Sequence, residues 1–164
     1  SFSLPIKIVR PFNTFGPRQS ARAVIPTIIS QLLNKNNSIE LGSLSPTRDL
    51  TFVKDTCDGF LEIYKSDFLF GEVTNIGMNS EISIGDLAKM IANLMNTEIL
   101  ITSSEKRVRP KNSEVERLVC DNSKLIKNTE WNSKYSLEDG ILEVIKWMRN
   151  PENLHYYKTG QYNV

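Results

Sequence analysis

The sequence predicts an α/β fold, and three observations support this class. Short runs rich in β-branched residues, such as residues 5–10 and 72–76, alternate with longer segments whose apolar residues recur every three or four positions. Stretches rich in Gly, Pro and small polar residues separate these segments. Apolar residues make up 40% of the 164 residues and charged residues 24%, as in an ordinary globular domain. We therefore expect helices packed on parallel strands, with residues 1–164 as one unit.

The first third of the chain is expected to form a strand, a helix and a second strand. Residues 5–10 form the first strand, and a loop rich in Gly, Pro and Arg follows it. Pro26 suits the first turn of a helix, because proline lacks the N–H that such a position leaves unbonded. The apolar face of this helix consists of Ile25, Ile28, Ile29, Leu32 and Leu33. Residues 39–41 form a short strand after it.

The middle of the chain is expected to hold two strands and two helices. The strands cover residues 47–53 and 72–76. Asp55 is expected to cap a helix, and Ser83 and Asp86 have the spacing of a capping box that opens another. The apolar face of the first of these helices is expected to carry Cys57, Phe60, Leu61 and Tyr64.

The last third is expected to be mainly helical. Residues 98–101 and 118–119 are rich in strand-forming residues. Asn122 is expected to cap a short helix, and Ser136 to begin the last long one. Alternating strand and helix patterns thus continue to the end of the chain.

Composition excludes several classes of protein. A net charge of +1 argues against nucleic-acid binding, and no stretch of about 20 apolar residues could span a bilayer. His155 is the single histidine, which argues against a zinc site built on several histidines and against a Ser-His-Asp triad. Cys57 and Cys120 do not form a C-x-x-C motif and are expected to be reduced thiols of a cytoplasmic protein.

Arginines are concentrated where a ligand would bind. Seven of the eight lie in or beside expected loops and strand ends: Arg10, Arg18, Arg22, Arg48, Arg107, Arg109 and Arg117. A planar guanidinium binds two oxygens at once, as phosphate recognition requires. Amides at the start of the helix near Ala23 and Val24 could assist. The alternative is that these arginines tie loops down through surface ion pairs.

Arg48 and Asn13 are the most specific candidates. Alternation in residues 47–53 places Arg48 on the same face as Leu50 and Phe52, where its charge needs an anion. That anion could be a protein carboxylate or a ligand phosphate. Asn13 follows the first strand, at the end of a parallel sheet where ligands bind, although an Asn in a turn is the alternative.

Two motifs of nicotinamide-dependent enzymes are absent from this sequence. No G-x-G-x-x-G or G-x-x-G-x-x-G motif opens a strand–helix unit. No tyrosine has a lysine four residues later. The residues therefore predict part of a ligand site without the groups that would perform a reaction.

The motifs together resemble those of extended short-chain dehydrogenases/reductases, the NAD-dependent epimerase/dehydratase family acting on nucleotide sugars. Residues 10–19 resemble their R-x-x-N-x-Y-G-P-R segment, with Phe15 in place of Tyr, and residues 48–55 resemble R-D-x-x-x-V-x-D. Residues 74–77 are similar to (Y/F)-N-(I/L)-G, and residues 109–124 to R-P-x(n)-D-x-S-K. The fuller pattern most resembles UDP-N-acetylglucosamine 4,6-dehydratases of the legionaminic-acid type.

This resemblance implies a role for each candidate residue. Pro11 and Phe12 would line the nicotinamide side of the cleft, and Asn13 would bind the sugar-nucleotide diphosphate. Arg48 and Arg109 would hold the diphosphate from two sides. Backbone at Ala23 and Val24 would contact the nucleotide, and Ile39 to Leu41 would flank its base. No catalytic residue and no metal ligand is expected in this chain.

The resemblance also implies a larger enzyme. The chain would be its C-terminal, nucleotide-sugar-binding portion, with the last strands of a Rossmann-type sheet, while the NAD- or NADP-binding portion and the catalytic Tyr and Lys lie upstream. A 4,6-dehydratase is favoured, inactive without that portion and homodimeric when complete. The alternatives are a 4-epimerase of the same fold and a non-catalytic sugar-nucleotide-binding module.

Overall fold

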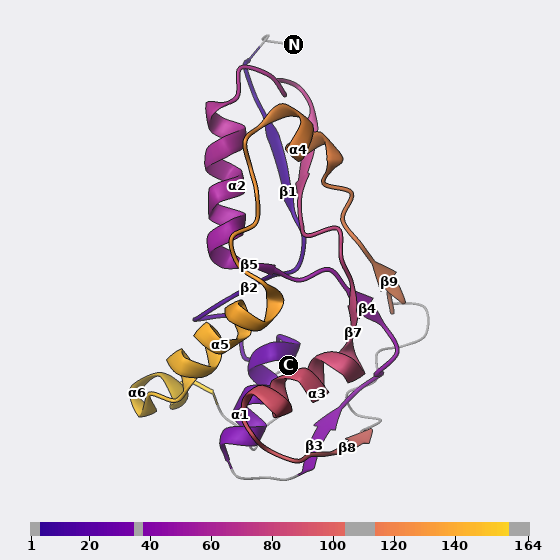
Figure 1. Cartoon of the computed structure of the whole chain (residues 1–164), viewed down its shortest axis with the longest axis vertical. Helices are drawn as coiled ribbons and strands as arrows, with labels where there is room; N and C mark the ends of the chain where they lie inside the picture. Colours follow the sequence, from indigo (N-terminus) through magenta and orange to yellow (C-terminus); the bar gives the residue numbers. More distant parts are fainter. Residues whose placement is uncertain (1–3, 35–37, 104–113, 158–164) are drawn as a thin grey trace.

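The computed structural model describes residues 4–34, 38–103 and 114–157, and its elements alternate between strand and helix (Figure 1). The strands are β1 (Ile8–Pro11), β2 (Thr14–Phe15), β3 (Ser38–Leu41), β4 (Thr47–Arg48), β5 (Thr51–Phe52), β6 (Val73–Ile76), β7 (Ile82–Ser83), β8 (Leu100–Ser103) and β9 (Arg117–Leu118). The helices are α1 (Val24–Leu33), α2 (Val53–Lys65), α3 (Ile84–Leu94), α4 (Ser123–Asn128), α5 (Leu137–Met148) and α6 (Pro151–Leu154). The expected α/β class is confirmed.

A parallel pair of strands, β1 and β6, forms one end of the molecule (Figure 1). Their register aligns Ile8 with Val73 and Pro11 with Ile76. A small buried cluster lies between this pair and helices α2 and α4, and it consists of Ile63, Leu69, Ile76, Leu125 and Trp131. The strands expected at residues 5–10 and 72–76 thus belong to a parallel sheet, as predicted, and the structure shows that they are neighbours in it.

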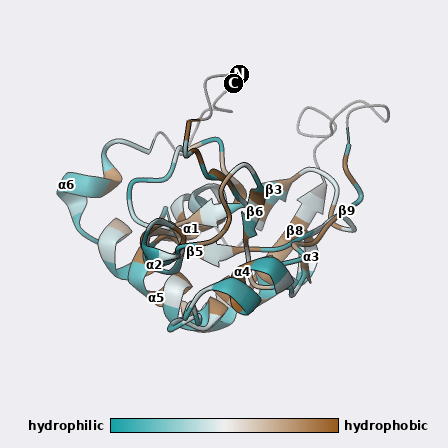
Figure 2. Ribbon diagram, turned by 90° about the horizontal axis from the view of Figure 1, so that it is seen from above, coloured by the Kyte–Doolittle hydropathy of each residue, from teal (hydrophilic) through white to brown (hydrophobic). Residues whose placement is uncertain are grey.

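A larger core occupies the other end of the molecule, where α1, α3 and α5 pack together beside the parallel pair β3–β8. Its fully buried side chains include Ile28 and Ile29 of α1, Leu87 of α3 and Ile141 of α5. Figure 2 shows apolar α1 in the interior and hydrophilic α6 at the periphery. The apolar face expected for the helix that contains Pro26 is therefore the face that α1 contributes to this core.

A three-stranded sheet in the order β7–β4–β9 lies between the two ends and carries Arg48. Strand β4 pairs antiparallel with β7 and parallel with β9. The single strand expected over residues 47–53 is wrong, because β4 and β5 are separate and Val53 already begins α2. Asp49 follows β4, is fully buried and accepts hydrogen bonds from backbone amides of other segments. At Asp49 the chain leaves the sheet that contains β4, and it then forms β5, which belongs to a different sheet.

Helix α2 corrects two further expectations. It begins at Val53, so Asp55 lies inside its first turn, where the carboxylate accepts the N–H groups of Lys134 and Tyr135 at 2.9 and 3.2 Å. The buried side of the helix consists of Asp55, Thr56, Gly59 and Ile63, whereas Cys57, Phe60, Leu61 and Tyr64 are exposed. The expected apolar face therefore points outward.

The physical reason is close packing of α2 against β6 at a glycine. A Cβ atom on Gly59 would lie only 2.8 Å from Cδ1 of Ile76, so the helix can approach the strand only where no side chain intervenes. Polar Asp55 is tolerated on this side because two backbone donors satisfy its carboxylate.

The helix starts give a mixed outcome. Ser83 accepts the amide of Asp86 at 3.0 Å, and Ser136 forms a complete capping box with Asp139, as predicted. Asn122 does occupy the N-cap position of α4, but its side chain does not cap the helix. Its amide nitrogen instead donates to the carbonyl of Gly77 at 2.8 Å and joins α4 to the end of β6.

Candidate anion-binding site

A pocket of about 330 Å³ opens where four segments meet: the loop after β1, the start of α1, the segment between β3 and β4, and the chain before β9. Its lining combines apolar walls with polar and charged groups, and consists of Asn13, Gln19, Arg22, Ala23, Val24, Ile25, Thr27, Leu41, Gly42, Ser43, Pro46, Arg48, Leu50, Ile84 and Glu114. Five of the candidate residues thus line one hollow: Asn13, Ala23, Val24, Leu41 and Arg48.

The start of α1 borders this pocket through Ala23, Val24 and Ile25. The N–H of Ala23 donates to the carbonyl of Ser20 at 2.9 Å and Pro26 has no N–H, so Val24 and Ile25 carry the helix-start amides that can meet a ligand. The N-cap residue Ala23 has no side chain that could cap the helix, and the first turn contains no acidic residue. Amide groups at such a helix start carry partial positive charge and bind anions. The absence of any capping side chain at Ala23 leaves this end of the ten-residue helix suited to a phosphate.

Asn13 connects the end of β1 to the turn that carries Arg48. Its side-chain nitrogen donates to the carbonyl of Asp49 at 2.9 Å, and its own carbonyl accepts the N–H of Thr51 at 3.3 Å. The side chain is only partly buried and lines the pocket. Asn13 therefore both fixes the turn between β4 and β5 and lines the pocket.

Arg48 is held by three hydrogen bonds. Nη1 donates to the carbonyls of Thr47 and Val115 at 2.8 and 2.6 Å, and Nη2 donates to Oε1 of Glu114 at 2.8 Å. The side chains of Arg48 and Glu114 are 15% and 14% exposed. The sequence left open whether a carboxylate or a ligand neutralises Arg48, and in this structure the carboxylate of Glu114 does so.

Asp49 fixes segments next to the pocket although it is not part of the lining, and no role was expected for it from the sequence. Its carboxylate is fully buried and accepts the amides of Met78 and Cys120 at 2.9 and 3.0 Å. A buried carboxylate with two backbone donors fixes the loops that supply them. The sequence contained Asp49 as the second residue of the R-D-x-x-x-V-x-D segment, but no role was expected for it.

Cys120 is not a nucleophile of this site. The side chain of Cys120 is fully buried, and a Cβ atom added to Gly77 would lie 2.3 Å from the Cβ atom of Cys120. Burial, with smaller contributions from the charges of Asp49 and Asp121, raises the pKa of the Cys120 thiol to about 12. The thiol is therefore protonated near neutral pH, where a nucleophilic cysteine would be a thiolate.

The remaining candidates lie elsewhere. Ile39 is fully buried in the core and is not part of the pocket lining, so the structure does not bring it together with Leu41 at the pocket, and its contact with a base stays a prediction. Pro11 and Phe12 lie at the end of β1 outside the lining, with Pro11 exposed. Arg109 lies outside the described residues. Arg117, at 71% side-chain exposure, pairs with Glu81 at 2.7 Å away from the pocket lining.

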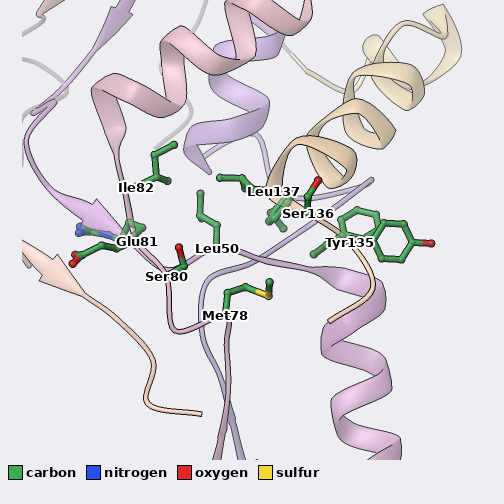
Figure 3. A pocket seen from close by; sticks show the side chains of 11 residues that line it. Leu50, Met78, Ser80, Glu81, Ile82, Tyr135, Ser136 and Leu137 are labelled. Carbon is green, nitrogen blue, oxygen red and sulfur yellow. The ribbon is translucent and has the colours of Figure 1, made fainter. Parts of the chain in front are cut away.

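A second, smaller hollow of about 130 Å³ shares Arg48 and Leu50 with the pocket. Figure 3 shows Leu50 between Met78 and Leu137, with the hydroxyl of Tyr135 pointing away from it. Phe15 and Phe52 also line it, their ring centroids 5.6 Å apart. An apolar hollow therefore adjoins the charged one on the Arg48 side.

The far end of the chain supports the loop before α1. The hydroxyl of Tyr157 donates to the carbonyl of Gln19 at 2.8 Å, and its ring meets that of Trp147 edge to face at 6.0 Å. Gln19 lines the pocket.

Within the described ranges, no group of three or more acidic, histidine or cysteine side chains could hold a metal ion, and no helix is long and apolar enough to cross a membrane.

Comparison with known proteins assigns this chain to a protein family. Residues 1–144 match the family model described as GDP-mannose 4,6 dehydratase. Human dTDP-D-glucose 4,6-dehydratase is 31% identical over 160 residues, which are 96% of this chain and 45% of that protein. UDP-N-acetyl-alpha-D-glucosaminuronate decarboxylase of Bacillus cytotoxicus is 31% identical over 155 residues, 92% of this chain and 48% of that one.

A solved structure agrees. UDP-glucuronic acid 4-epimerase from Bacillus cereus, in complex with UDP-glucuronic acid and NAD, superposes with a TM-score of 0.80 at 25% identity, over 90% of this chain and 46% of that one. The architecture is that of extended Rossmann-type short-chain dehydrogenases/reductases. The chain belongs to the GDP-mannose 4,6-dehydratase family, which confirms the expected resemblance. It spans about half the length of the curated relatives it matches.

Proposed function

We propose that the pocket binds the diphosphate of a nucleotide sugar, and that the protein to which this chain belongs is a nicotinamide-dependent nucleotide-sugar 4,6-dehydratase. One observation carries the proposal: Arg48, Asn13 and the uncapped start of α1 all line a single hollow. A guanidinium, a side-chain amide and helix-start amides are the donors that phosphate oxygens require.

Each wall of the pocket has a role in this proposal. Arg48 and Asn13 bind the diphosphate, and Arg109 contributes a second guanidinium. Backbone at Ala23 and Val24 contacts the nucleotide, with the N–H of Val24 as donor, because the N–H of Ala23 is bonded to the carbonyl of Ser20. Leu41 packs against its base, since it lies at the pocket end of β3. The apolar hollow around Leu50 adjoins the diphosphate position and excludes water there.

A nicotinamide cofactor, NAD or NADP, would supply hydride transfer when bound. The residues of this chain fit only one wall of its site, because Pro11 and Phe12 stand at the carboxyl end of a parallel strand while no glycine-rich turn is present. In our proposal these residues pack against the nicotinamide ring. The remaining cofactor contacts and the Tyr–Lys pair belong to the portion of the enzyme outside this sequence, and the chain alone is inactive.

UDP-N-acetylglucosamine is the substrate we propose. The Bacillus cytotoxicus relative, named for a UDP-N-acetylated sugar, supports this choice, whereas the human relative is named for a dTDP sugar. A 4-epimerase is the second candidate, favoured by the structural likeness to UDP-glucuronic acid 4-epimerase. A non-catalytic sugar-nucleotide-binding module is the third. We propose a cytoplasmic homodimer as the complete enzyme.

Calorimetric titration of the chain with UDP, dTDP and GDP, with UMP as the control, tests the proposal. The three diphosphates should bind more tightly than UMP, because only they place two phosphates between Arg48 and the start of α1. Preference among the three reports the base. Equal affinity for UDP and UMP, or no binding of any of them, would contradict a diphosphate site.

A further inference from the structure

Glu114 pairs with Arg48 within the lining of the pocket. Both side chains line the same hollow, and Oε1 of Glu114 accepts from Nη2 of Arg48 at 2.8 Å. We infer that Glu114 is a built-in competitor of the ligand, whose carboxylate holds Arg48 until a diphosphate displaces it and so lowers the affinity of the pocket. This inference rests on the proposed function.

The orientation of Arg48 does not depend on Glu114. Nη1 donates to two backbone carbonyls, that of Thr47 in β4 and that of Val115, two residues before β9. Both acceptors are main-chain groups and remain when the Glu114 side chain rotates. Only the Nη2 edge is held by a group with rotatable bonds, so this edge is the one that can exchange its partner.

A phosphate and Glu114 cannot share that edge without cost. A phosphate oxygen bonded to Nη2 would lie in contact with the Glu114 carboxylate, and like charges in contact repel. With side chains only 15% and 14% exposed, both charges are largely withdrawn from water, and this desolvation offsets much of their attraction. The net stabilisation of the pair is therefore modest, and a dianionic ligand can displace Glu114. Glu114 therefore raises the ligand concentration at which Arg48 becomes available, without preventing binding.

Whether substitution of Glu114 strengthens or weakens the binding of UDP tests this inference. Glu114→Gln keeps the shape of the side chain and removes its charge, so we expect UDP to bind about fivefold more tightly, which is about 1 kcal/mol. Glu116→Gln is the matched control: it removes the same charge two residues away from an exposed side chain whose backbone carbonyl, not its carboxylate, bonds β4. That control should leave the affinity for UDP unchanged.

A double-mutant cycle tests whether the effect passes through Arg48. In an Arg48→Ala background, Glu114→Gln should no longer tighten UDP binding, because the guanidinium for which the two anions compete is gone. Circular dichroism checks that each variant is folded, and Glu114→Ala takes the place of Glu114→Gln if the latter is not.

Four outcomes separate the possibilities. Equal or weaker binding by Glu114→Gln, with wild-type binding intact, overturns the inference and makes Glu114 a residue that orients Arg48. An equal gain for Glu116→Gln overturns it in favour of a general field effect. Persistence of the gain without Arg48 also overturns it. If neither wild type nor variant binds UDP, the proposed function and the inference fall together.

Discussion

The carboxylate of Asp49 accepts a hydrogen bond from the backbone N–H of Cys120 at 3.0 Å, although 71 positions separate the two residues. The same carboxylate holds the amide of Met78 at the end of the β6 loop. Arg48, directly before Asp49, therefore has its backbone fixed by contacts from both neighbouring segments. The turn that carries Arg48 is thus held in place by a residue that does not line the pocket.

The two thiols should differ sharply in reactivity. Cys57 is exposed, whereas burial raises the pKa of Cys120 to about 12, so at pH 8 Cys120 is protonated and shielded. A colourimetric thiol reagent should modify one thiol per chain quickly and the second only after unfolding. A Cys57→Ser variant should show no fast reaction. Two fast thiols in the wild type would contradict the packing of Cys120.

Substitution of Arg48 tests the anion site directly. Arg48→Ala should weaken UDP binding by about 1.5–3 kcal/mol, the range for hydrogen bonds to charged groups. Arg117→Ala serves as control, since Arg117 is exposed and pairs with Glu81 outside the pocket lining. Calorimetry compares the two. An unchanged affinity in Arg48→Ala would show that Arg48 pairs with Glu114 but does not bind UDP.

Gly140 should tolerate no side chain. A Cβ there would lie 2.7 Å from Cζ of Phe15 and 2.9 Å from Cδ2 of Phe52, inside a packed aromatic pair. Gly140→Ala should lower the free energy of unfolding by about 1–3 kcal/mol, as overpacking does. Gly85→Ala is the control, because its Cβ would be in ordinary contact with Leu44 at 3.5 Å. Urea denaturation should show a loss for the first variant alone.

Lys7 should stabilise the carboxyl end of α2. Its ammonium donates to the carbonyls of Ile63 and Tyr64 at 2.8 and 3.2 Å, and also to that of Ser66, so it satisfies several acceptors that the helix end leaves unpaired. Lys7→Met keeps the aliphatic stem and should cost about 1–2 kcal/mol in thermal unfolding.

The control for Lys7 is Lys65→Met. Lys65 is exposed and bonds only the neighbouring turn through Glu62, so its loss should cost less than about 0.5 kcal/mol. Similar losses for the two variants would show that the position of Lys7 at the helix end is unimportant.

The chain should self-associate in isolation. Unpaired edges of its two-stranded parallel sheets favour association, and so does the exposed apolar side of α2, where Leu61 is 54% and Tyr64 82% exposed. Light scattering should show oligomers whose fraction grows with concentration. Leu61→Glu should reduce it, and Leu142→Glu, on α5, should do so less. A monodisperse monomer at high concentration would contradict the expectation.

Local signals predicted local structure well. The Ser83 and Ser136 caps follow from spacing alone, since both partners of each bond lie within one helical turn. The parallel neighbours β1 and β6 followed from their strand patterns. The face of α2 did not, because the residues that decide it, Gly59 and Ile76, lie on different elements and the apolar stripe of the helix faces solvent.

The residues of the pocket could also be predicted only where the signal lies within one element of the sequence. Asn13, Ala23, Val24, Leu41 and Arg48 stand at the ends of elements, where parallel strands and helix starts converge, and they line one pocket. Ile39 shares the face of Leu41 in an alternating strand, but it lies two residues further from the end and is in the core. Asp49 and Glu114 were missed because their partners are distant in sequence.

The hydrogen bond from Tyr157 to Gln19 joins residues 138 positions apart. A protease that trims the chain from its carboxyl end as far as residue 157 would thus release a support of the loop that forms one wall of the pocket. Shortened forms of the protein can then lose ligand affinity while every side chain that touches the ligand is still present.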